Sequence, residues 1–357
     1  MPLSQIIPSV PVLGAKNTPD TLINHTGEVA FGYFDGPVKR FGIEDFYYLT
    51  SMDKCASKLS KHFDFKQFQF VSVVTPEFII AVAIADIRYL GSAFCYFYDV
   101  NNDKIIETQW LKLGSVGYQM SSSPMNGSAF IRSHKGELTL LIEEGQWHLK
   151  VKTARLSMKV NLCSSVLSSP LVMCTPTGYS GWTYTQKHNG LNVTGDVSID
   201  NRKIPLNDAL ASYDFSAGFM RRETSWRWGS INACLNGDVF GINLAAGVNE
   251  TGANENCFWI NGERHLLPPV HFDFIRQGAV KWDLASQKSW RIYSANNQVN
   301  LVFIPKNVRR EKLNLFFLKS NFRQYVGHYS GTVVENNGRI HQLNHIMGLA
   351  EDHFAKW

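Results

Sequence analysis

Hydrophobic and polar residues alternate along much of the chain, a period of two that is typical of β-strands with one buried and one wet face. In ARLSMKVNL, residues 154–162, every second residue from Ala154 is apolar and the residues between are polar or charged. Trp147, Leu149 and Val151 alternate in the same way with basic residues just before this run. The two runs predict neighbouring strands joined by a short turn.

The same pattern predicts strands throughout the chain. They are expected at residues 70–74, 78–86, 93–100, 128–133, 138–143, 191–199, 219–229, 239–248, 257–260, 271–275, 290–294, 300–304, 313–320 and 325–334. Asn-Gly pairs, as at Asn189, Asn236, Asn261 and Asn337, are typical of two-residue hairpin turns. Short helices are expected only at residues 206–211 and at the C-terminus. The sequence therefore predicts an all-β protein of antiparallel barrels or sandwiches.

A chain of 357 residues can form one large β domain or two domains of ordinary size. We expect two β domains, residues 1–175 and 176–357, joined in the loop-rich stretch SSPLVMCTPTGYSG, residues 168–181.

The apolar stretch 78–98 is about as long as a membrane-spanning helix. Asp86 and Arg88 lie at its centre, where each charge costs about 2.5–3.5 kcal/mol in a bilayer, and Gly91 follows. Two buried strands around the turn DIRYLG explain it better, so no integral membrane span is expected. The start of the chain, MPLSQIIPSVPVLGAK, lacks a basic region and a continuous apolar core, and this favours a cytoplasmic protein.

The composition is that of a globular protein rich in aromatic residues. Hydrophobic residues make up 44% and charged residues 18%, and the 9 Trp, 13 Tyr and 23 Phe favour an amphipathic interior or groove. The formal charge is +5, but no block of five like charges occurs, and KNVRREK, residues 306–312, is expected to be a solvated turn. Nucleic acid is therefore not an expected partner. The six cysteines have no metal-binding spacing and are expected to be reduced and buried.

The stretch GFMRRETSWRWGS, residues 218–230, concentrates charged and aromatic side chains on one strand. With a period of two, Arg222, Thr224, Trp226 and Trp228 point one way, whereas Arg221, Glu223, Ser225 and Arg227 point the other. The first set either fills a core or lines a cavity. In a cavity, Arg222 needs a carboxylate or an anionic ligand, because an unpaired buried guanidinium is costly. Asp214, Asn243 and Asn256 are nearby candidate partners.

The histidines near the C-terminus, in GRIHQLNHIMGLAEDHFAKW, invite a metal interpretation. His341 and His345 would share a face on a helix, but the pattern favours a strand, so we expect no metal. The motifs of nucleotide-binding loops, zinc proteases and serine hydrolases are absent, and no cofactor is expected. The closing EDHFAKW is expected to dock onto the body of the protein.

Four segments carry a family resemblance: YDFSAGFMRRETSWRWGS, GINLAAGVNETGANENCFWINGERHLL, FRQYVGHYSG and GLAEDHFAKW. Together with FKQFQFVSVVTPEF and TPTGYSGWTYTQKHNGLNVTG from the first half, they resemble the bacterial family catalogued as domain of unknown function 2804. The family usually has Trp at the position of Phe68. The resemblance carries over the following positions: Asp214, Arg222, Thr224, Trp226, Trp228, Asn243, Asn256, Trp259, Arg323, Gln324, Glu351, Asp352, His353 and Trp357.

The family looks like a distant member of the calycin or lipocalin-like group, whose double-barrel relatives include carotenoid hydratases, tocopherol cyclase and Diels-Alderase-type cyclases. The resemblance implies two tandem lipocalin-like antiparallel β-barrels or sandwiches with an apolar pocket between or within them. It implies no reaction, since a fold hosts many functions.

Three functions remain open from the sequence. The first is binding of an apolar or amphipathic small molecule (lipid, isoprenoid or polyketide), with Arg222, Thr224, Trp226, Trp228, Asn243, Asn256 and Asp352 as candidate binding residues. The second is a cofactor-independent hydratase, isomerase or cyclase, with Asp214, Glu223, Glu351 and His353 as candidate catalytic residues. In it, a carboxylic acid protonates an alkene or ether, and indole faces stabilise the cation. The third is a structural or interaction protein without pocket chemistry.

Overall fold

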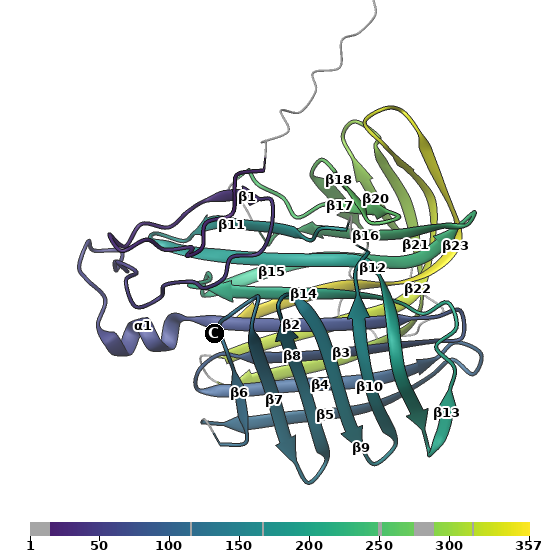
Figure 1. The fold of residues 1–357 in the computed structure, drawn as a ribbon, viewed down its shortest axis with the longest axis horizontal. Coiled ribbons are helices and arrows are strands. Elements are labelled where there is room, and N and C mark those ends of the chain that lie inside the picture. Colours follow the sequence, from purple (N-terminus) through teal and green to yellow (C-terminus); the bar gives the residue numbers. More distant parts are fainter. Residues whose placement is uncertain (1–14, 115, 166–167, 249–251, 275–288, 316–317) are drawn as a thin grey trace, which may run out of the picture.

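The computed structural model describes residues 15–357 except 115, 166–167, 249–251, 275–288 and 316–317. These residues form two curled antiparallel sheets, one a nearly closed barrel and the other a half-barrel (Figure 1). The fold is thus all-β, as the alternation predicts. One helix occurs in the described chain, α1 (Lys58–Asp64), capped by the Ser57 side chain, which accepts from the Ser60 amide.

The first sheet has 14 strands and occupies the first part of the chain. Its strands are β1 (Gly32–Phe34), β2 (Lys66–Val74), β3 (Phe78–Asp86), β4 (Leu90–Asp99), β5 (Lys104–Leu113), β6 (Tyr118–Met120), β7 (Gly127–Ser133), β8 (Gly136–Glu143), β9 (Gln146–Thr153), β10 (Leu156–Cys163), β11 (Leu171–Thr177), β12 (Gly181–Ile199), β13 (Arg202–Ile204) and β14 (Leu210–Gly218). The main path runs β5-β4-β3-β2-β14-β12-β10-β9-β8-β7-β6.

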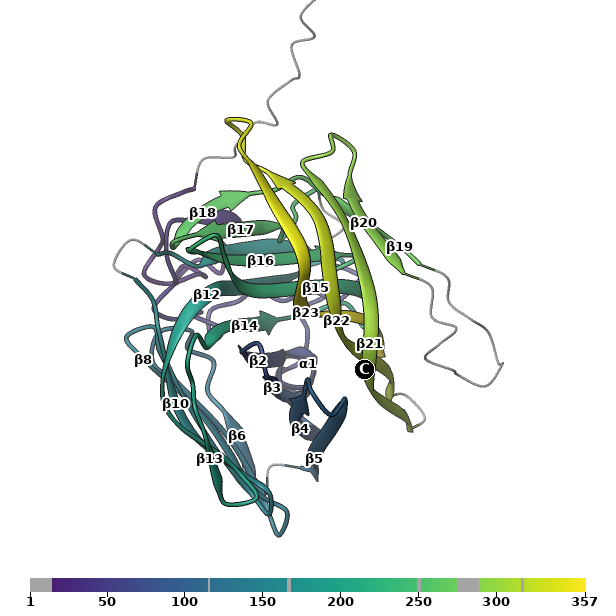
Figure 2. The same cartoon turned by 90° about the vertical axis from the view of Figure 1, so that its right-hand side faces the viewer.

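The second sheet has nine strands, in the order β18-β17-β16-β15-β23-β22-β21-β20-β19. Their bounds are β15 (Glu223–Leu235), β16 (Asp238–Ala246), β17 (Cys257–Ile260), β18 (Glu263–Leu266), β19 (Val270–Asp273), β20 (Trp290–Ser294), β21 (Val299–Leu315), β22 (Leu318–Val334) and β23 (Ile340–Lys356). The expected strand at residues 271–275 ends outside the described residues. Figure 2 shows the first sheet curling from β5 through β14 to β8 and the second sheet on the other side of β2–β5.

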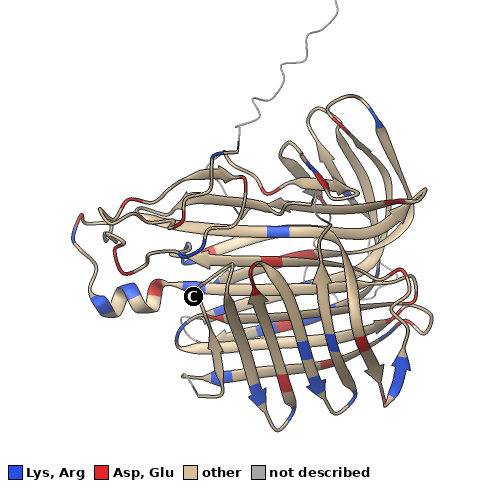
Figure 3. Ribbon diagram, viewed as in Figure 1, with Lys and Arg blue, Asp and Glu red and all other residues tan. Residues whose placement is uncertain are grey.

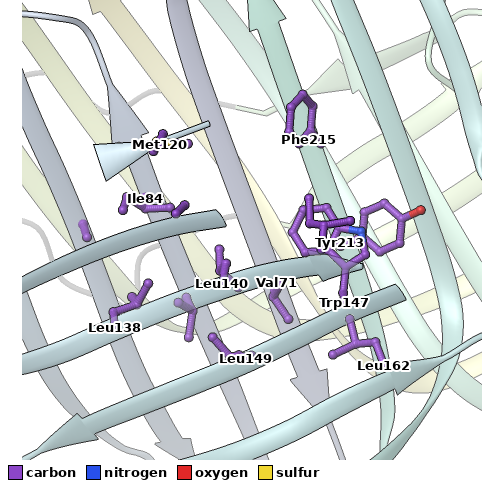
Figure 4. Packing of buried hydrophobic residues seen from close by; sticks show 14 of the residues in the cluster. Val71, Ile84, Met120, Leu138, Leu140, Trp147, Leu149, Leu162, Tyr213 and Phe215 are labelled. Atoms are coloured by element: carbon purple, nitrogen blue, oxygen red, sulfur yellow. The ribbon is translucent and has the colours of Figure 1, made fainter. Parts of the chain in front are cut away.

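The interior of the first sheet is filled by large apolar side chains from opposite strands (Figure 4). Trp147 stacks on Tyr213 with ring centroids 4.4 Å apart, and Leu138, Leu149 and Val71 belong to the same cluster. The interior of the barrel formed by the first sheet is therefore a packed core.

Strands β2–β4 are apolar on both faces, which is why residues 78–98 form a nearly continuous apolar run. On β3, Ile80, Val82 and Ile84 join the barrel core, whereas Ile79, Ala81 and Ala83 join a second cluster that faces the second sheet. The two strands expected in this run are present as β3 and β4, with Arg88 at a positive φ of 73° in the turn. Among the described residues, no helix has the length and apolarity to cross a membrane.

The outer strands alternate as the sequence predicts, and their charges face water. On β10, Leu156, Met158 and Val160 are buried, and Ser157 and Lys159 are exposed. Figure 3 shows Lys and Arg scattered among Asp and Glu over β7–β10.

Several local expectations are wrong. Residues 206–211 form no helix, because β14 begins at Leu210, and the C-terminal residues belong to β23. Residues 306–312 lie within β21 and form no solvated turn, and the Arg309 side chain is buried. The cysteines are free, but Cys55, Cys163 and Cys234 are exposed.

The two sheets are joined along β12. Its residue Asn189 donates through Nδ2 to Ser230 Oγ at 2.7 Å and to the carbonyl oxygens of Ile231 and Ile242 at 3.3 and 3.0 Å. The Gly190 amide donates to Asn232 Oδ1 at 2.8 Å. Strand β11 and all of β12 belong to the first sheet, which ends at Gly218. The domain division at residues 175 and 176 stays a prediction, since sheet membership alone defines no domain.

Candidate functional site

A cavity of about 230 Å³ lies between the two sheets. One wall is the outer face of β2–β4, β12 and β14, and the other is formed by β15, β21, β22 and β23. Aromatic rings line both walls, through Trp226, Trp228 and Phe322 on the second sheet and through Phe70 and Phe94 on the first. Ala83 and Ala85 on the first-sheet wall are short and leave room between the rings.

Strand register places the polar groups of the cavity. Lys187 pairs with Asp214 and Asp214 with Phe70 across β12, β14 and β2. On the opposite wall, Trp228 pairs with Glu351 and Glu351 with Gln324 across β15, β23 and β22. The Phe70 and Trp228 rings meet edge to face at 5.4 Å, so these two rows oppose each other at one end of the cavity, here called the deep end.

The first-sheet side of the deep end is a buried ion network. The Lys187 ammonium contacts the Asp214 carboxylate and lies 3.2 Å from Glu255 Oε2. Ser216 Oγ donates to Asp214 Oδ1 at 3.0 Å, and Thr185 Oγ1 donates to Glu255 Oε1 at 3.3 Å. Burial alone would lower the pKa of Lys187, but the two carboxylates outweigh it and hold the pKa above its usual value.

Glu351, on the other wall, is a carboxyl group that titrates near neutrality. Only 7% of the residue is exposed, and burial raises the pKa of Glu351 to about 7 against the opposing hydrogen bonds from Gln324 and Trp226. The Asp214 charge raises the pKa further and Lys187 opposes it. At neutral pH this group exists in both its acid and its carboxylate form, as a general acid or base requires.

Hydrogen bonds fix the orientation of the Glu351 carboxyl. The Tyr96 hydroxyl donates to Gln324 Oε1 at 2.5 Å, which turns the Gln324 amide nitrogen toward Glu351. That nitrogen donates to Glu351 Oε1 at 2.6 Å, and Trp226 Nε1 donates to Oε2 at the longer distance of 3.3 Å. The proton of the acid form therefore belongs on Oε2, the oxygen with the weaker donor.

His353 lies beside Trp226, with ring centroids 4.1 Å apart. Its Nε2 is 3.0 Å from Ser320 Oγ, and Phe322 meets it edge to face at 4.9 Å. Burial, and secondarily the Arg309 charge, lowers the pKa of His353 to about 3. The imidazole is therefore neutral at physiological pH.

The structure brings six of the sequence-predicted site residues together. Asp214, Thr224, Trp226, Trp228, Glu351 and His353 all line the cavity, although they come from β14, β15 and β23.

The other predicted site residues do not line the cavity. Arg222 is exposed and precedes β15, and Glu223 pairs at the surface with Lys356 at 3.0 Å. Asp352 faces away and binds Arg227 and Arg323, each at 3.1 Å. Two predicted asparagines lie behind the cavity wall and accept hydrogen bonds from residues that line it. Asn243 Oδ1 accepts from Trp228 Nε1 at 2.7 Å, and Asn256 Oδ1 accepts from the Ala245 amide at 2.7 Å.

Sequence reasoning missed five further residues of the cavity wall. Lys66, Phe70 and Phe94 come from the first half of the chain, and Lys187 and Glu255 come from the second. The sequence did mark Lys187, because it is a charged residue whose neighbours along the strand are uncharged. No local sequence feature, however, predicts its pairing with Asp214.

The part of the chain that the structure describes contains no cluster of metal-binding side chains. No group of three or more His, Cys, Asp and Glu residues there could hold a metal ion. His341, a residue of the metal interpretation, instead binds Glu335 through Nε2 at 2.7 Å.

These features define an all-β protein with a polar-ended cavity between two curled sheets. The chain belongs to the family DUF2804, a domain of unknown function, whose model matches residues 15–357. No curated protein matches the chain.

Two solved structures are similar to this one at low sequence identity. Kievitone hydratase from Nectria haematococca has a TM-score of 0.52 and 9% identity, over 80% of this chain and 88% of that one. A candidate ATTH from Nitrosomonas europaea has a TM-score of 0.45 and 11% identity, over 86% of this chain and 98% of that one. At 9% identity, the likeness to kievitone hydratase is one of fold.

Proposed function

We propose that the protein binds an apolar or amphipathic small molecule, such as a lipid, isoprenoid or polyketide, in the cavity between its sheets. The observation that carries this proposal is the cavity of about 230 Å³, lined by Trp226, Trp228 and Phe322 on one wall and by further phenylalanines and alanines on the other. Apolar surface buried there contributes about 25 cal/mol per Å². The few polar groups at the deep end orient the ligand, as is usual in small-molecule sites.

Native mass spectrometry of gently purified protein, followed by organic extraction, tests this proposal. We expect a retained apolar compound in the wild type. Ala85→Phe places a ring in the cavity and should abolish retention. Ala154→Phe makes the same change at an exposed position and should leave retention unchanged. An apo mass for the wild type, with no binding of any added amphiphile, would favour a structural or interaction protein instead.

A second candidate is an enzyme of the hydratase or cyclase kind, and Glu351 is the observation that favours it. In a hydration, the Glu351 carboxyl would give its proton to one carbon of an alkene, leaving a carbocation beside the faces of Trp226 and Trp228. Water would add to the cation and lose a proton to a carboxylate, either Glu351 or Asp214. The net change is alkene plus water to alcohol, and no oxidant or cofactor enters.

Carboxyl-to-amide substitutions separate the two candidates. In an enzyme, Glu351→Gln and Asp214→Asn keep the ligand but abolish its conversion, which is followed as uptake of heavy oxygen from labelled water. Glu137, on β8, forms an ion pair with Lys150 at the surface. Glu137→Gln therefore serves as the matched control and should keep full activity. If wild-type protein never converts the extracted ligand or its dehydrated form, the binding function stands alone.

A further inference from the structure

The two ends of the cavity differ in charge. Lys187 and Asp214 mark the deep end, whereas Gly218, four residues further along β14, pairs with Lys66 on β2. Four residues of strand span about 13 Å. On the opposite wall, Thr224 pairs with Ala355 and Ala355 with Ser320, beside Lys319. We call this Lys66 and Lys319 end of the cavity the mouth.

Lys66 is a buried cation at the mouth. Only 5% of the residue is exposed, and its ammonium donates to the carbonyl oxygens of Phe63 and Ile87. It makes no ion pair with a residue that the structure describes. Burial lowers its pKa to about 8, while Asp64 and Asp86 raise it and Arg88 and Arg222 lower it. An ammonium in this position gains stability from an anion, because burial without a counter-ion is costly.

The surroundings of Lys66 add hydrogen-bond donors and positive charge. Trp357 also lines the cavity, and its buried Nε1 has no acceptor among the described residues. Lys319 and Arg221 line the same end. The acidic residues in the described wall lie elsewhere, three at the deep end and Glu311 in an ion pair with Arg309 at 2.6 Å.

We propose that the ligand is an anionic amphiphile, held by a carboxylate or phosphate against Lys66 and Trp357 with its apolar body extending toward Trp228 and Glu351. This inference rests on the proposed binding function and adds the class and the direction of the ligand. The reacting or recognised part of the molecule lies in its apolar portion, and the anionic group stays at the mouth, as far from Asp214 and Glu255 as the cavity allows.

Calorimetric titration with four ligands of one chain length tests the charge preference. Decanoate, decyl phosphate, decanol and decylamine are each titrated into the full-length protein after retained ligand has been extracted. We expect at least one of the two anions to bind about tenfold more tightly than decanol, the value of one hydrogen bond to a charged group, and decylamine to bind most weakly. The stronger of the two anions identifies a carboxylate or a phosphate ligand.

Variants locate the anionic group. Lys66→Met retains the apolar stem and should reduce the preference for the better anion over decanol to roughly threefold or less. Trp357→Phe removes the indole N–H but keeps an aromatic ring, and it should reduce the same preference by a smaller factor. Lys356→Met removes a neighbouring charge that pairs with Glu223 outside the cavity and should leave the preference unchanged.

The outcomes separate the inference from the function beneath it. If decanol binds as tightly as both anions, or decylamine binds best, the anionic ligand is overturned and cavity binding stands. An anion preference that survives in both Lys66→Met and Trp357→Phe overturns the assigned position. If none of the four ligands binds and nothing is extracted, the proposed function itself fails. Should Lys66→Met not fold, Trp357→Phe and Lys319→Met carry the comparison.

Discussion

Glu351 gives the protein a stability that depends on pH. Its carboxyl has an ordinary pKa of 4.5 in the unfolded chain and about 7 in the fold. Between these values the folded state binds the proton and the unfolded state does not, so the stabilising contribution is complete below about pH 4.5 and is lost as pH rises through about 7. Glu351→Gln removes this loss, which amounts to about 3 kcal/mol at most.

The measurement is urea unfolding of the wild type and Glu351→Gln at about pH 5 and about pH 8. Relative to the wild type, the variant should gain stability as pH rises. Glu137→Gln, whose carboxylate forms a partly exposed pair with Lys150, should show no such gain. A stability difference that is the same at both pH values would contradict the raised pKa.

The hydrogen bond from Gln324 lowers the pKa of Glu351. Its amide donates to Glu351 Oε1 at 2.6 Å, a bond that favours the ionised form. We expect Gln324→Leu to raise the pKa of Glu351 above about 7, and Tyr96→Phe to raise it less, because the Gln324 amide is then free to turn. Infrared titration of the carboxylic C=O band, referenced to the same variants carrying Glu351→Gln, measures the shift. A lowered pKa in Gln324→Leu would show that this bond does not govern the group.

At the scale of residues, the sequence allowed part of the cavity wall to be anticipated. Alternation places Thr224, Trp226 and Trp228 on one side of β15, where they line the cavity. It cannot place Arg222, because the chain is not a strand before Glu223 and the period of two does not apply there. Lys187 and Glu255 escaped notice because their meeting depends on the packing of two sheets.

At the scale of elements, β12 carries an ammonium group that two largely buried carboxylates share. Lys187→Met should destabilise the protein by about 3–5 kcal/mol, because Asp214 and Glu255 both lose the buried Lys187 charge that they contact. The matched control is Lys203→Met, which removes an exposed pair with Asp196 next to the same strand and should change stability little. Denaturant unfolding measures both, and equal effects would mean that the buried network contributes no more than a surface pair.

Strands β12 and β16 approach each other too closely for a side chain at Gly241. A Cβ there would lie 2.6 Å from Asn189 Cβ and 2.7 Å from the Gly190 nitrogen. Gly241→Ala should therefore cost about 1–3 kcal/mol and weaken the Asn189 bonds between the sheets. Gly36→Ala is the control, since the nearest atom to its added Cβ is 3.6 Å away. Thermal unfolding of the two variants tests the expectation, which equal melting temperatures would contradict.

Elements with a clear hydrophobic pattern were predictable, and those set by tertiary contacts were not. The two strands within residues 78–98 were predictable, because Asp86 and Arg88 interrupt the apolar run near its centre. The run is apolar because both faces of these strands are covered in the fold. The charges in residues 306–312 predicted a solvated turn, yet these residues form part of β21. Arg309 is neutralised there by Glu107 and Glu311 and covered by Phe94, whose ring centroid lies 3.8 Å away.

At the scale of the whole molecule, the sequence indicated two β structures but not how they share a boundary. The shared layer consists of residues from the outer face of β2–β4 and the inner-facing positions of β15, β22 and β23, among them Tyr96, Trp228 and Val326. Each strand pattern shows that a face is apolar, but it does not show which distant strand covers that face. The cavity arises within this layer, so its position could not be read from either half alone.

The same layer predicts that the molecule unfolds as one unit. Neither sheet can separate without exposing Phe70, Tyr96 and Trp228, which are at most 7% exposed, and without breaking the Asn189 bonds. Calorimetry should show one transition. Val151→Ala in the barrel core and Val326→Ala in the shared layer should each move it down by roughly 2–4 °C, since each removes buried methyl groups. Two transitions, with Val151→Ala moving only one of them, would show that the sheets fold independently and that the cavity opens before the protein unfolds.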